Sequence, residues 1–108
     1  MKYSIIIPTY KHFEDCLKPC VESLLQHTDF QQDIELIVVA NGCEKDGTVE
    51  YVRNLRNTIG NNISIVDVDR ACGYTKAIGI GIDVSKGEYI VLLNNDLTIM
   101  GSNWLDML

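Results

Sequence analysis

The sequence predicts an α/β domain with three layers, α/β/α, around a mainly parallel sheet. Short apolar runs rich in β-branched residues alternate along the chain with segments whose apolar residues recur three and four positions apart. This alternation lets each helix return the chain to begin the next strand in the same direction. The 108 residues, in which we find no repeat or linker, fit a single domain over 1–108. We expect four parallel strands in the order 3-2-1-4.

The first strand and helix begin the chain. YSIIIP at 3–8 is a β-branched run, and we expect Pro8 to end it because proline cannot continue a hydrogen-bonded ladder. A helical stripe follows, with Pro19 in its first regular turn or at a kink. The apolar members of this stripe are Phe13, Leu17, Cys20, Val21, Leu24 and Leu25.

The second unit repeats the pattern. IELIVVA at 34–40 predicts a strand, and TVEYVRNLRN at 48–57 predicts a helix. Asp46 precedes this helix and can cap its N-terminus. The apolar residues at helical spacing are Val49, Val52 and Leu55.

NNISIVDVD at 61–69 predicts the third strand, and GYTKAIGIGIDVSKG at 73–87 predicts the third helix, with Gly87 as its C-cap. The GIG at 79–81 lies within this helix, where close helix packing explains it better than a phosphate-binding turn does. We expect the apolar stripe of the helix to comprise Tyr74, Ala77, Ile78, Ile82 and Val84.

The fourth strand is the continuous apolar run Tyr89 to Leu93, which we expect to be buried on both faces. It ends in Asn94-Asn95-Asp96, polar groups that would each need a partner if buried. The last segment, GSNWLDML at 101–108, begins another helix, and its predicted caps are Ser102 or Asn103.

Polar residues gather where the predicted strands end. In open sheets of this kind, ligands bind beyond the carboxyl ends of the strands. Here those ends read PTY, ANG, VDVDR and NND. The edge is therefore rich in amides and carboxylates, namely Asn41, Asp67, Asp69, Asn94, Asn95 and Asp96.

Charge and motifs exclude several classes of ligand. A net charge of −6 and a pI near 4.7 argue against nucleic acid as a partner, because that binding needs clustered lysine and arginine. No glycine-rich turn follows the first strand, and no GxxxxGK[ST] is present, so the sequence predicts neither a dinucleotide site nor a P-loop. An acidic edge suits a phosphorylated ligand only with a divalent cation between them. We therefore expect a metal-bridged diphosphate here, although Asp96 could instead be a turn or helix cap.

The four cysteines, Cys16, Cys20, Cys43 and Cys72, form no CxxC pair and have no histidine partner at metal-binding spacing. We interpret them as free thiols, which favours a reducing compartment. No stretch has the length of a transmembrane helix, and the start of the chain lacks the features of a signal peptide. The expected location is the cytoplasm, including the cytoplasmic face of a membrane.

Three segments together carry a resemblance to a known family: YSIIIPTYKH, IELIVVANGCEKDGT, and GYTKAIGIGIDVSKGEYIVLLNNDLTI followed by NWL. In order and spacing they resemble the family 2 glycosyltransferases, inverting enzymes of the nucleotide-diphospho-sugar transferase fold. The resemblance runs over nearly the whole chain. It implies a sugar transfer from a UDP-, dTDP- or GDP-sugar to the hydroxyl of a glycan or lipid-linked acceptor.

The resemblance also implies site residues. Asp96 would hold Mn²⁺ or Mg²⁺ on the donor diphosphate, where the cation would neutralise charge on the leaving group. Lys76 or Arg70 would supply positive charge near the diphosphate, unless they are solvated surface residues. The implied nucleotide-binding residues are Pro8, Thr9, Tyr10, Asn41, Asp69, Gly73, Lys76, Asn94 and Asn95.

The family's general base would lie beyond Leu108, so the resemblance implies no catalytic residue within this chain. The chain would be the N-terminal, nucleotide-sugar-binding part of a truncated transferase domain, inactive in isolation. We expect an apolar patch at its C-terminal end to be covered by self-association into a homo-oligomer.

Three positions depart from the family pattern. Ala40 stands where the family usually has an aspartate that contacts the base, Ala71 replaces an asparagine, and Ile78-Gly79 replaces an Arg-Asn pair. Two alternatives to a transferase therefore stay open. One is a catalytically silent nucleotide-sugar-binding module, and the other is a structural α/β module that self-associates.

Overall fold

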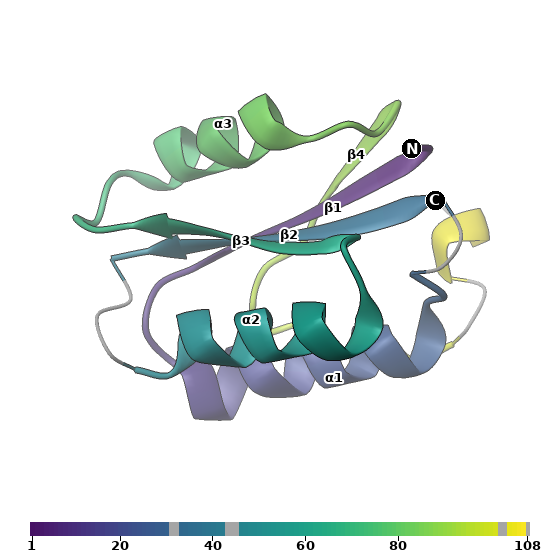
Figure 1. The fold of residues 1–108 in the computed structure, drawn as a ribbon, viewed down its shortest axis with the longest axis horizontal. Helices are drawn as coiled ribbons and strands as arrows, with labels where there is room; N and C mark the ends of the chain where they lie inside the picture. Colours follow the sequence, from purple (N-terminus) through teal and green to yellow (C-terminus); the bar gives the residue numbers. More distant parts are fainter. Residues whose placement is uncertain (31–32, 43–45, 102–103, 108) are drawn as a thin grey trace.

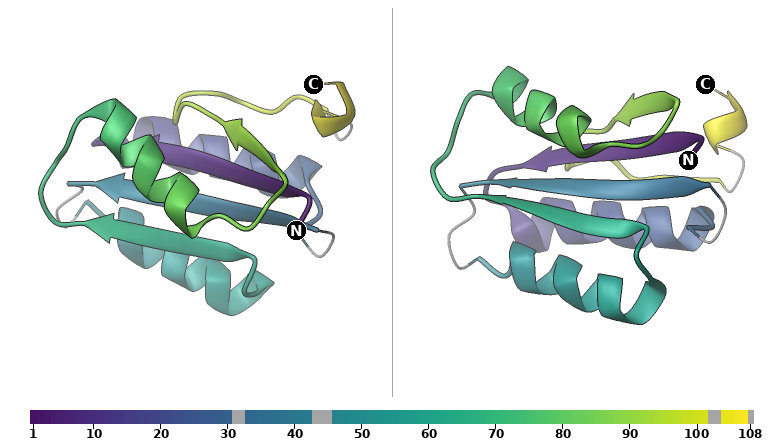
Figure 2. Two further views of the ribbon diagram at one scale, coloured as in Figure 1. Left: turned by 90° about the horizontal axis from the view of Figure 1, so that it is seen from above. Right: turned by 45° about the horizontal axis from the view of Figure 1, so that its top comes forward.

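The computed structural model describes residues 1–30, 33–42, 46–101 and 104–107, and its centre is a four-stranded parallel sheet in the order β3-β2-β1-β4. Two helices cover one face of this sheet and a third covers the other (Figure 1; Figure 2). The predicted α/β/α architecture and strand order are confirmed. The elements are β1 (Tyr3–Thr9), η1 (Phe13–Leu17), α1 (Lys18–His27), β2 (Ile34–Asn41), α2 (Thr48–Ile59), β3 (Ile63–Val68), α3 (Tyr74–Val84), β4 (Tyr89–Leu92) and η2 (Trp104–Met107).

The continuous apolar runs of β1 and β2 reflect burial on both faces. Successive side chains of a strand point to opposite faces, so Ile5 and Ile7 pack with the core on the α1 and α2 side, whereas Ile6 packs beneath α3. Leu36 and Ile37 of β2 divide in the same way. All of these side chains are fully buried. These two central strands therefore hold both halves of the core.

Pro8 does not end the first strand as expected. It lies inside β1, in register with Val39 of β2. The ladder between β1 and β4 ends at Ile6, whose carbonyl accepts the N–H of Leu93 at 3.0 Å. Residues two apart on a strand face the same neighbour, so the N–H that proline lacks would point to the side where β4 has already stopped.

The first two helices follow the predicted stripes. A π-helical turn, η1, runs directly into α1, and Pro19 is the second residue of α1. The N-cap residue of α2 is Gly47 rather than Asp46, although an Asp46 carboxylate oxygen accepts the N–H of Thr48, the first residue of the helix, at 2.9 Å. Gly47 between them has φ of 97°, a conformation that favours glycine.

The third helix buries only part of the predicted stripe, at Ala77. Its buried residues are Ala77 and Gly81, whereas Tyr74, Ile82 and Val84 are exposed. A Cβ on Gly81 would lie 2.7 Å from Ile6 Cγ2, so the small residues let the helix backbone approach the sheet closely. The prediction of close packing at 79–81 therefore holds at Gly81, while the larger stripe residues face outward.

The turn after α3 is held by a buried carboxylate. Glu35 of β2 accepts the Ser4 hydroxyl and the Lys86 backbone N–H, both at 2.6 Å, and Ser4 Oγ in turn accepts the Gly87 N–H at 2.7 Å. Gly87 is not the helix cap that we expected. The helix ends at Val84, and Gly87 is packed against Ser4, where a Cβ would lie 2.5 Å from the hydroxyl oxygen. This network fixes the point from which β4 starts.

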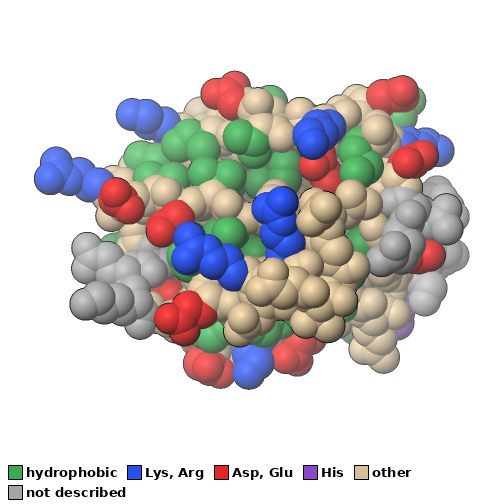
Figure 3. Space-filling view, in the orientation of Figure 1, with side chains coloured by type: hydrophobic (Ala, Val, Ile, Leu, Met, Phe, Trp, Pro, Cys, Tyr) green, Lys and Arg blue, Asp and Glu red, His purple; other side chains and the backbone are tan. Residues whose placement is uncertain are grey.

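The fourth strand is an exposed edge strand, and the prediction of burial on both faces is wrong. Tyr89, Ile90 and Leu92 are all exposed, because β4 has a strand neighbour on one side only and α3 lies over β1 and β2. Figure 3 shows hydrophobic side chains gathered over α3. Together α3 and β4 expose Tyr74, Ile82, Val84, Tyr89, Ile90 and Leu92, of which Ile90 and Leu92 lie on the α3 side of the sheet and Tyr89 on the other side.

After β4 the chain crosses to the α1 side of the sheet. The Ile99 N–H donates to Ser23 Oγ at 2.9 Å, and the Trp104 indole donates to Thr28 Oγ1 at 2.8 Å. The predicted last helix is a short 3₁₀ turn, η2, and its expected caps Ser102 and Asn103 lie outside the described residues. Among the residues that the structure describes, no helix is long and apolar enough to cross a membrane.

Candidate functional site

A pocket of about 280 Å³ opens where β1 and β2 end. Because these strands are parallel neighbours, their carboxyl ends bring Pro8, Thr9 and Asn41 to the same edge of the sheet. Tyr10 adds a half-exposed ring at the rim. The residues that line this pocket are Pro8, Thr9, Tyr10, Asn41, Ala71, Cys72 and Tyr74.

Asn41 shapes the wall of this pocket. Its Nδ2 donates to the Cys72 carbonyl at 2.8 Å, and its Oδ1 accepts the Cys72 backbone N–H at 2.8 Å. The side chain is nearly buried, so both halves of the amide hold the chain that follows β3 rather than water. Gly42 has φ of 71°, and a Cβ there would lie 2.8 Å from Ala71, so glycine permits this close approach.

The two asparagines after β4 contact residues that line this pocket. Asn95 Nδ2 donates to Thr9 Oγ1 at 3.1 Å, and the Tyr74 hydroxyl donates to Asn94 Oδ1 at 3.1 Å. These contacts link the loop after β4 with β1 and with the start of α3. The polar triplet that ends the fourth strand therefore lies beside the pocket, as the sheet topology predicts.

A second, wider pocket of about 550 Å³ adjoins the first, sharing Tyr10 and Ala71 with it. Asp69 and Arg70 line this space, so two further residues singled out from the sequence lie there. The full lining is Tyr10, Lys11, His12, Gly42, Asp46, Asp69, Arg70 and Ala71. Tyrosine and mixed charges at its rim suit a ligand with a flat ring and a charged group.

Four predicted nucleotide-binding residues do not line these pockets, namely Gly73, Lys76, Asn94 and Asn95. Gly73 is the N-cap residue of α3, and Lys76 is exposed on the first turn of that helix. Neither is among the described residues that line the two pockets. The structure thus places five of the nine predicted nucleotide-binding residues in the pocket linings, with Asn94 and Asn95 in contact with lining residues and Gly73 and Lys76 further out.

Asp96 is exposed in the turn after β4, and its negative charge helps to raise the pKa of two cysteine thiols. Burial raises the pKa of Cys20 to about 11, and the Asp96 carboxylate adds to the rise while a backbone hydrogen bond from Leu97 lowers it. Partial burial, Asp15 and Asp96 also raise the pKa of Cys16. An exposed carboxylate beside amide oxygens is a donor set that Mg²⁺ or Mn²⁺ accepts.

The raised pKa of Cys20 predicts a loss of stability at alkaline pH. Between pH 9.0 and about 11 the unfolded chain releases this proton while the folded chain keeps it, so the free energy of unfolding falls as pH rises through that window. We expect denaturant titrations under reducing conditions to show this fall. The slope should be shallower in Cys20→Ala, and equal slopes in the two proteins would contradict the assignment.

One statement from the sequence about cysteine needs correction. His12 does lie at metal-binding distance from Cys16: the Nδ1 of His12, a carboxylate oxygen of Asp15 and the Sγ of Cys16 all lie within 4.8 Å of one another. Asp15 and Cys16 follow His12 by three and four residues, and this helical spacing was the signal in the sequence for the cluster. The free state of Cys16, Cys20 and Cys72 is confirmed, and Cys43 lies outside the described residues.

Two other residues were missed. Tyr74 was expected to be a core residue of the third helix, yet its hydroxyl contacts Asn94 beside the pocket. Glu35 was counted only as part of an apolar strand, although a carboxylate within such a run must find donors when it is buried. That mismatch between residue type and environment was the signal for the Glu35 network.

Comparison with known proteins finds glycosyltransferases among the relatives of this chain. The chain is 29% identical over 96 residues to the poly(ribitol-phosphate) beta-glucosyltransferase of Bacillus spizizenii. It is 25% identical over 99 residues to the poly(ribitol-phosphate) beta-N-acetylglucosaminyltransferase TarS of Staphylococcus aureus. These alignments cover 89% of this chain but only 15% and 16% of the two relatives, so the chain spans about a sixth of their length.

Solved structures agree with the fold. A crystal structure of TarS in complex with UDP-GlcNAc matches with a TM-score of 0.81 and 27% identity, covering 99% of this chain and 30% of that one. A mannosyltransferase from Pyrobaculum calidifontis in complex with GDP-Man and Mn²⁺ matches with a TM-score of 0.74, covering 96% and 30%. At 23% identity, this second likeness concerns the fold.

The family itself is shown by a match over almost the entire chain. The model of glycosyl transferase family 2 covers residues 4–108, which include every strand except the first residue of β1. The parallel sheet and the polar edge described above lie within that range. The chain therefore belongs to glycosyl transferase family 2.

Proposed function

We propose that this chain is the N-terminal, donor-binding part of a glycosyltransferase domain that takes a sugar from a nucleoside diphosphate donor, with a UDP-sugar as the first choice. The observation that carries the proposal is the pair of adjoining pockets at the carboxyl edge of a family 2 sheet. TarS, which shares this fold at 27% identity, was solved with UDP-GlcNAc. The likeness to TarS supports uracil over guanine or thymine without fixing the sugar.

Different residues at the two pockets have different roles in binding the nucleotide. Tyr10 lies on both pockets with its ring half exposed, so it can stack on a base or ribose. Thr9 and Asn95 are joined by a hydrogen bond and present polar groups beside it. Asn41 holds the loop at Cys72 in place and thereby positions the wall opposite Tyr10.

We assign Asp96 to a divalent cation on the donor diphosphate. The carboxylate is exposed at the same edge, next to the amides of Asn94 and Asn95, and such oxygen donors suit Mn²⁺ or Mg²⁺. A bound cation would supply Lewis-acid neutralisation of the leaving diphosphate. Arg70 on the wider pocket offers a second positive charge for phosphate oxygens.

The acceptor side of the reaction lies outside these residues in our proposal. An inverting transfer needs a carboxylate base for the acceptor hydroxyl, and we place it beyond Leu108. The acceptor would be a glycan or a lipid-linked glycan, in keeping with the polymer-modifying relatives. The free thiols of Cys16, Cys20 and Cys72 support a reducing compartment, and we propose the cytoplasm.

Calorimetric titration of the chain with UDP, GDP and dTDP, each with and without Mn²⁺, tests this function. We expect saturable binding of one nucleotide, tightest for UDP and stronger with Mn²⁺. No binding of any of the three would contradict the donor-binding role. Tighter binding of GDP or dTDP would retain that role and overturn the choice of UDP.

Tyr10→Ala is expected to weaken UDP binding about tenfold, which corresponds to about 1.4 kcal/mol and lies within the range for a lost stacking contact. Tyr89→Ala is the matched control, since it removes an equally exposed ring from the edge strand β4. Its affinity for UDP should stay at the wild-type value. Equal losses in the two variants would show that Tyr10 has no special contact with the nucleotide.

A second candidate is a catalytically silent nucleotide-sugar-binding module. Ala40 favours it, because this position is fully buried in β2 and offers no carboxylate to a base. The module would bind UDP-GlcNAc with Mn²⁺, yet a polypeptide that extends beyond Leu108 would neither transfer nor hydrolyse the sugar. Release of UDP by such a polypeptide decides between the two candidates.

The structural alternative rests on the exposed β4 edge. The outer edge of β4 has unpaired backbone groups, and its side chains Tyr89, Ile90 and Leu92 are exposed. A strand of a second copy could pair with this edge. Self-association without any nucleotide affinity would favour that alternative. Sedimentation velocity over a range of concentrations, run beside the nucleotide titration, separates it from the donor-binding function.

A further inference from the structure

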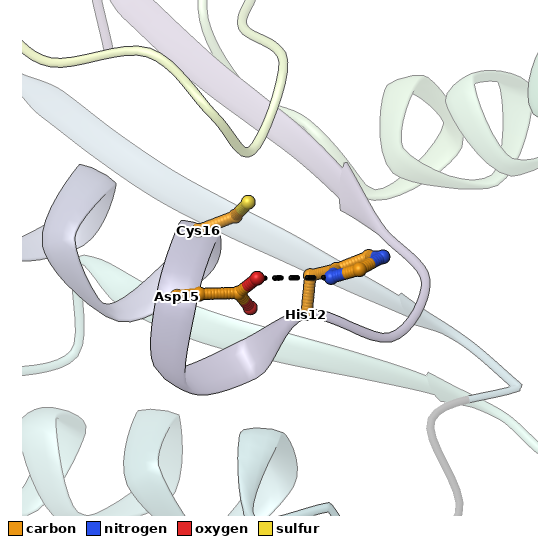
Figure 4. A group of neighbouring side chains, drawn as sticks. All are labelled: His12, Asp15 and Cys16. Carbon is orange, nitrogen blue, oxygen red and sulfur yellow. Dashed lines mark hydrogen bonds and ion pairs between the residues drawn. The ribbon is translucent and has the colours of Figure 1, made fainter.

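The turn that follows β1 brings together three different metal-ligating side chains. His12, Asp15 and Cys16 each offer one ligand atom, and these atoms lie within 4.8 Å of one another. The His12 Nδ1 and an Asp15 carboxylate oxygen are already 3.1 Å apart. Figure 4 shows the three side chains on one side of the turn, with the imidazole and the carboxylate facing each other.

An unusual backbone creates this arrangement. Lys11 and His12 both have left-handed conformations, with φ of 59° and 56°, which non-glycine residues seldom adopt in succession. The His12 carbonyl then accepts the N–H groups of both Cys16 and Leu17, at 3.0 and 3.1 Å, opening the π-helical turn η1. Strained backbone and π-helical turns are both associated with functional sites. Here they fold His12 back over the first turn of the helix.

The donor set points to a particular class of metal. Imidazole nitrogen, carboxylate oxygen and thiolate sulfur together suit Zn²⁺ and similar borderline ions, whereas Mg²⁺ and Mn²⁺ prefer oxygen donors alone. Two ligand atoms around Zn²⁺ lie about 3 to 4 Å apart, so the present group needs only small rotations of its side chains. His12 and Asp15 are exposed and free to make them.

We propose that His12, Asp15 and Cys16 form a Zn²⁺-class site with three protein ligands, leaving at least one position open to water. His12 also lines the wider pocket, which places the ion at the pocket rim. The site is distinct from the oxygen-donor site assigned to Asp96 and does not depend on nucleotide binding.

Titration of the reduced, metal-free chain with Co²⁺, in the absence of nucleotide, tests the proposal. A thiolate ligand gives a thiolate-to-cobalt charge-transfer absorption in the near ultraviolet, and Zn²⁺ should displace the Co²⁺ at one ion per chain. We expect Cys16→Ser to lose this absorption and to bind Zn²⁺ at least tenfold more weakly. His12→Gln and Asp15→Asn should each weaken Zn²⁺ binding as well.

Cys72→Ser is the matched control, because Cys72 is also a free, half-buried thiol but is hydrogen-bonded to Asn41. Its charge-transfer absorption and Zn²⁺ affinity should equal those of the wild type. Zn²⁺ should also raise the melting temperature of the wild type and of Cys72→Ser, but not that of Cys16→Ser. Absorption that persists in Cys16→Ser, or no stoichiometric binding in the wild type, overturns the site. Because no nucleotide is present, either result leaves the donor-binding proposal to its own test.

Discussion

Asp96→Asn is expected to remove the Mn²⁺-dependent part of UDP binding, a loss of at least tenfold, or about 1.4 kcal/mol. Replacing the carboxylate with an amide takes away the one anionic oxygen ligand that we assign to the cation. The affinity measured without metal should hardly change. Titration calorimetry with and without Mn²⁺ gives both values from the same preparation.

The fold of the Asp96→Asn variant should be unharmed, since the exposed turn after β4 contributes little to the core. Asp83→Asn makes the same chemical change at an exposed position on α3 and should leave the metal dependence intact. If Asp96 were only a turn or helix cap, asparagine would replace it well and nothing would change. Equal Mn²⁺-dependent affinities for the wild type and Asp96→Asn would therefore remove the metal assignment.

Glu35→Ala is expected to destabilise the protein by about 3 kcal/mol, because two donors lose a charged, buried acceptor. The Ser4 hydroxyl and the Lys86 N–H would both be left without it. For a domain of this size, such a loss lowers the melting temperature by roughly 15 °C. Thermal unfolding followed by circular dichroism measures the shift.

The matched control is Glu14→Ala, which removes an exposed glutamate whose surface pair with Lys18 spans 3.9 Å. Such pairs contribute less than about 1 kcal/mol, so its melting temperature should stay near that of the wild type. Glu35→Gln keeps an acceptor oxygen without the charge and should recover part of the loss. Amide exchange in 86–92 should accelerate in Glu35→Ala, because this carboxylate holds the turn that starts β4. A Glu35→Ala protein as stable as Glu14→Ala would show that the network is incidental.

The sequence determined the sheet and its chemically important edge. Apolar runs alternating with helical stripes are local features, and they indicate parallel strands joined by right-handed crossovers. With α3 on the opposite face from α1 and α2, β4 lies beside β1 in the order 3-2-1-4 (Figure 1). Residues that directly follow a strand must then lie at its carboxyl end. For that reason the sequence alone predicts that Thr9 and Asn41 lie together at the carboxyl edge of the sheet. The structure places the pocket at that edge.

Only the tertiary structure decided which faces are buried and which side chains meet. The sequence shows that Ile82 and Leu92 are apolar residues at positions that a core could bury. Whether another element covers them depends on long-range packing. Here α3 packs over β1 and β2 through Ala77 and Gly81, and β4 has a strand neighbour on one side only, so Leu92 stays exposed. Hydrogen-bond partners far apart in the sequence are likewise invisible to local patterns, because no spacing rule links Glu35 to Lys86.

The side-chain cluster in the turn after β1 also could not be predicted from local sequence patterns alone, although its residues are close in the sequence. The spacing of His12, Asp15 and Cys16 fits one face of a helix, but only when His12 adopts the left-handed conformation that starts the π-helical turn. That conformation is unfavourable on its own and persists only where the surrounding structure imposes it. The sequence predicted the helical stripe from Phe13 onward but not the left-handed residues before it, so the packing of the folded chain supplied the cluster.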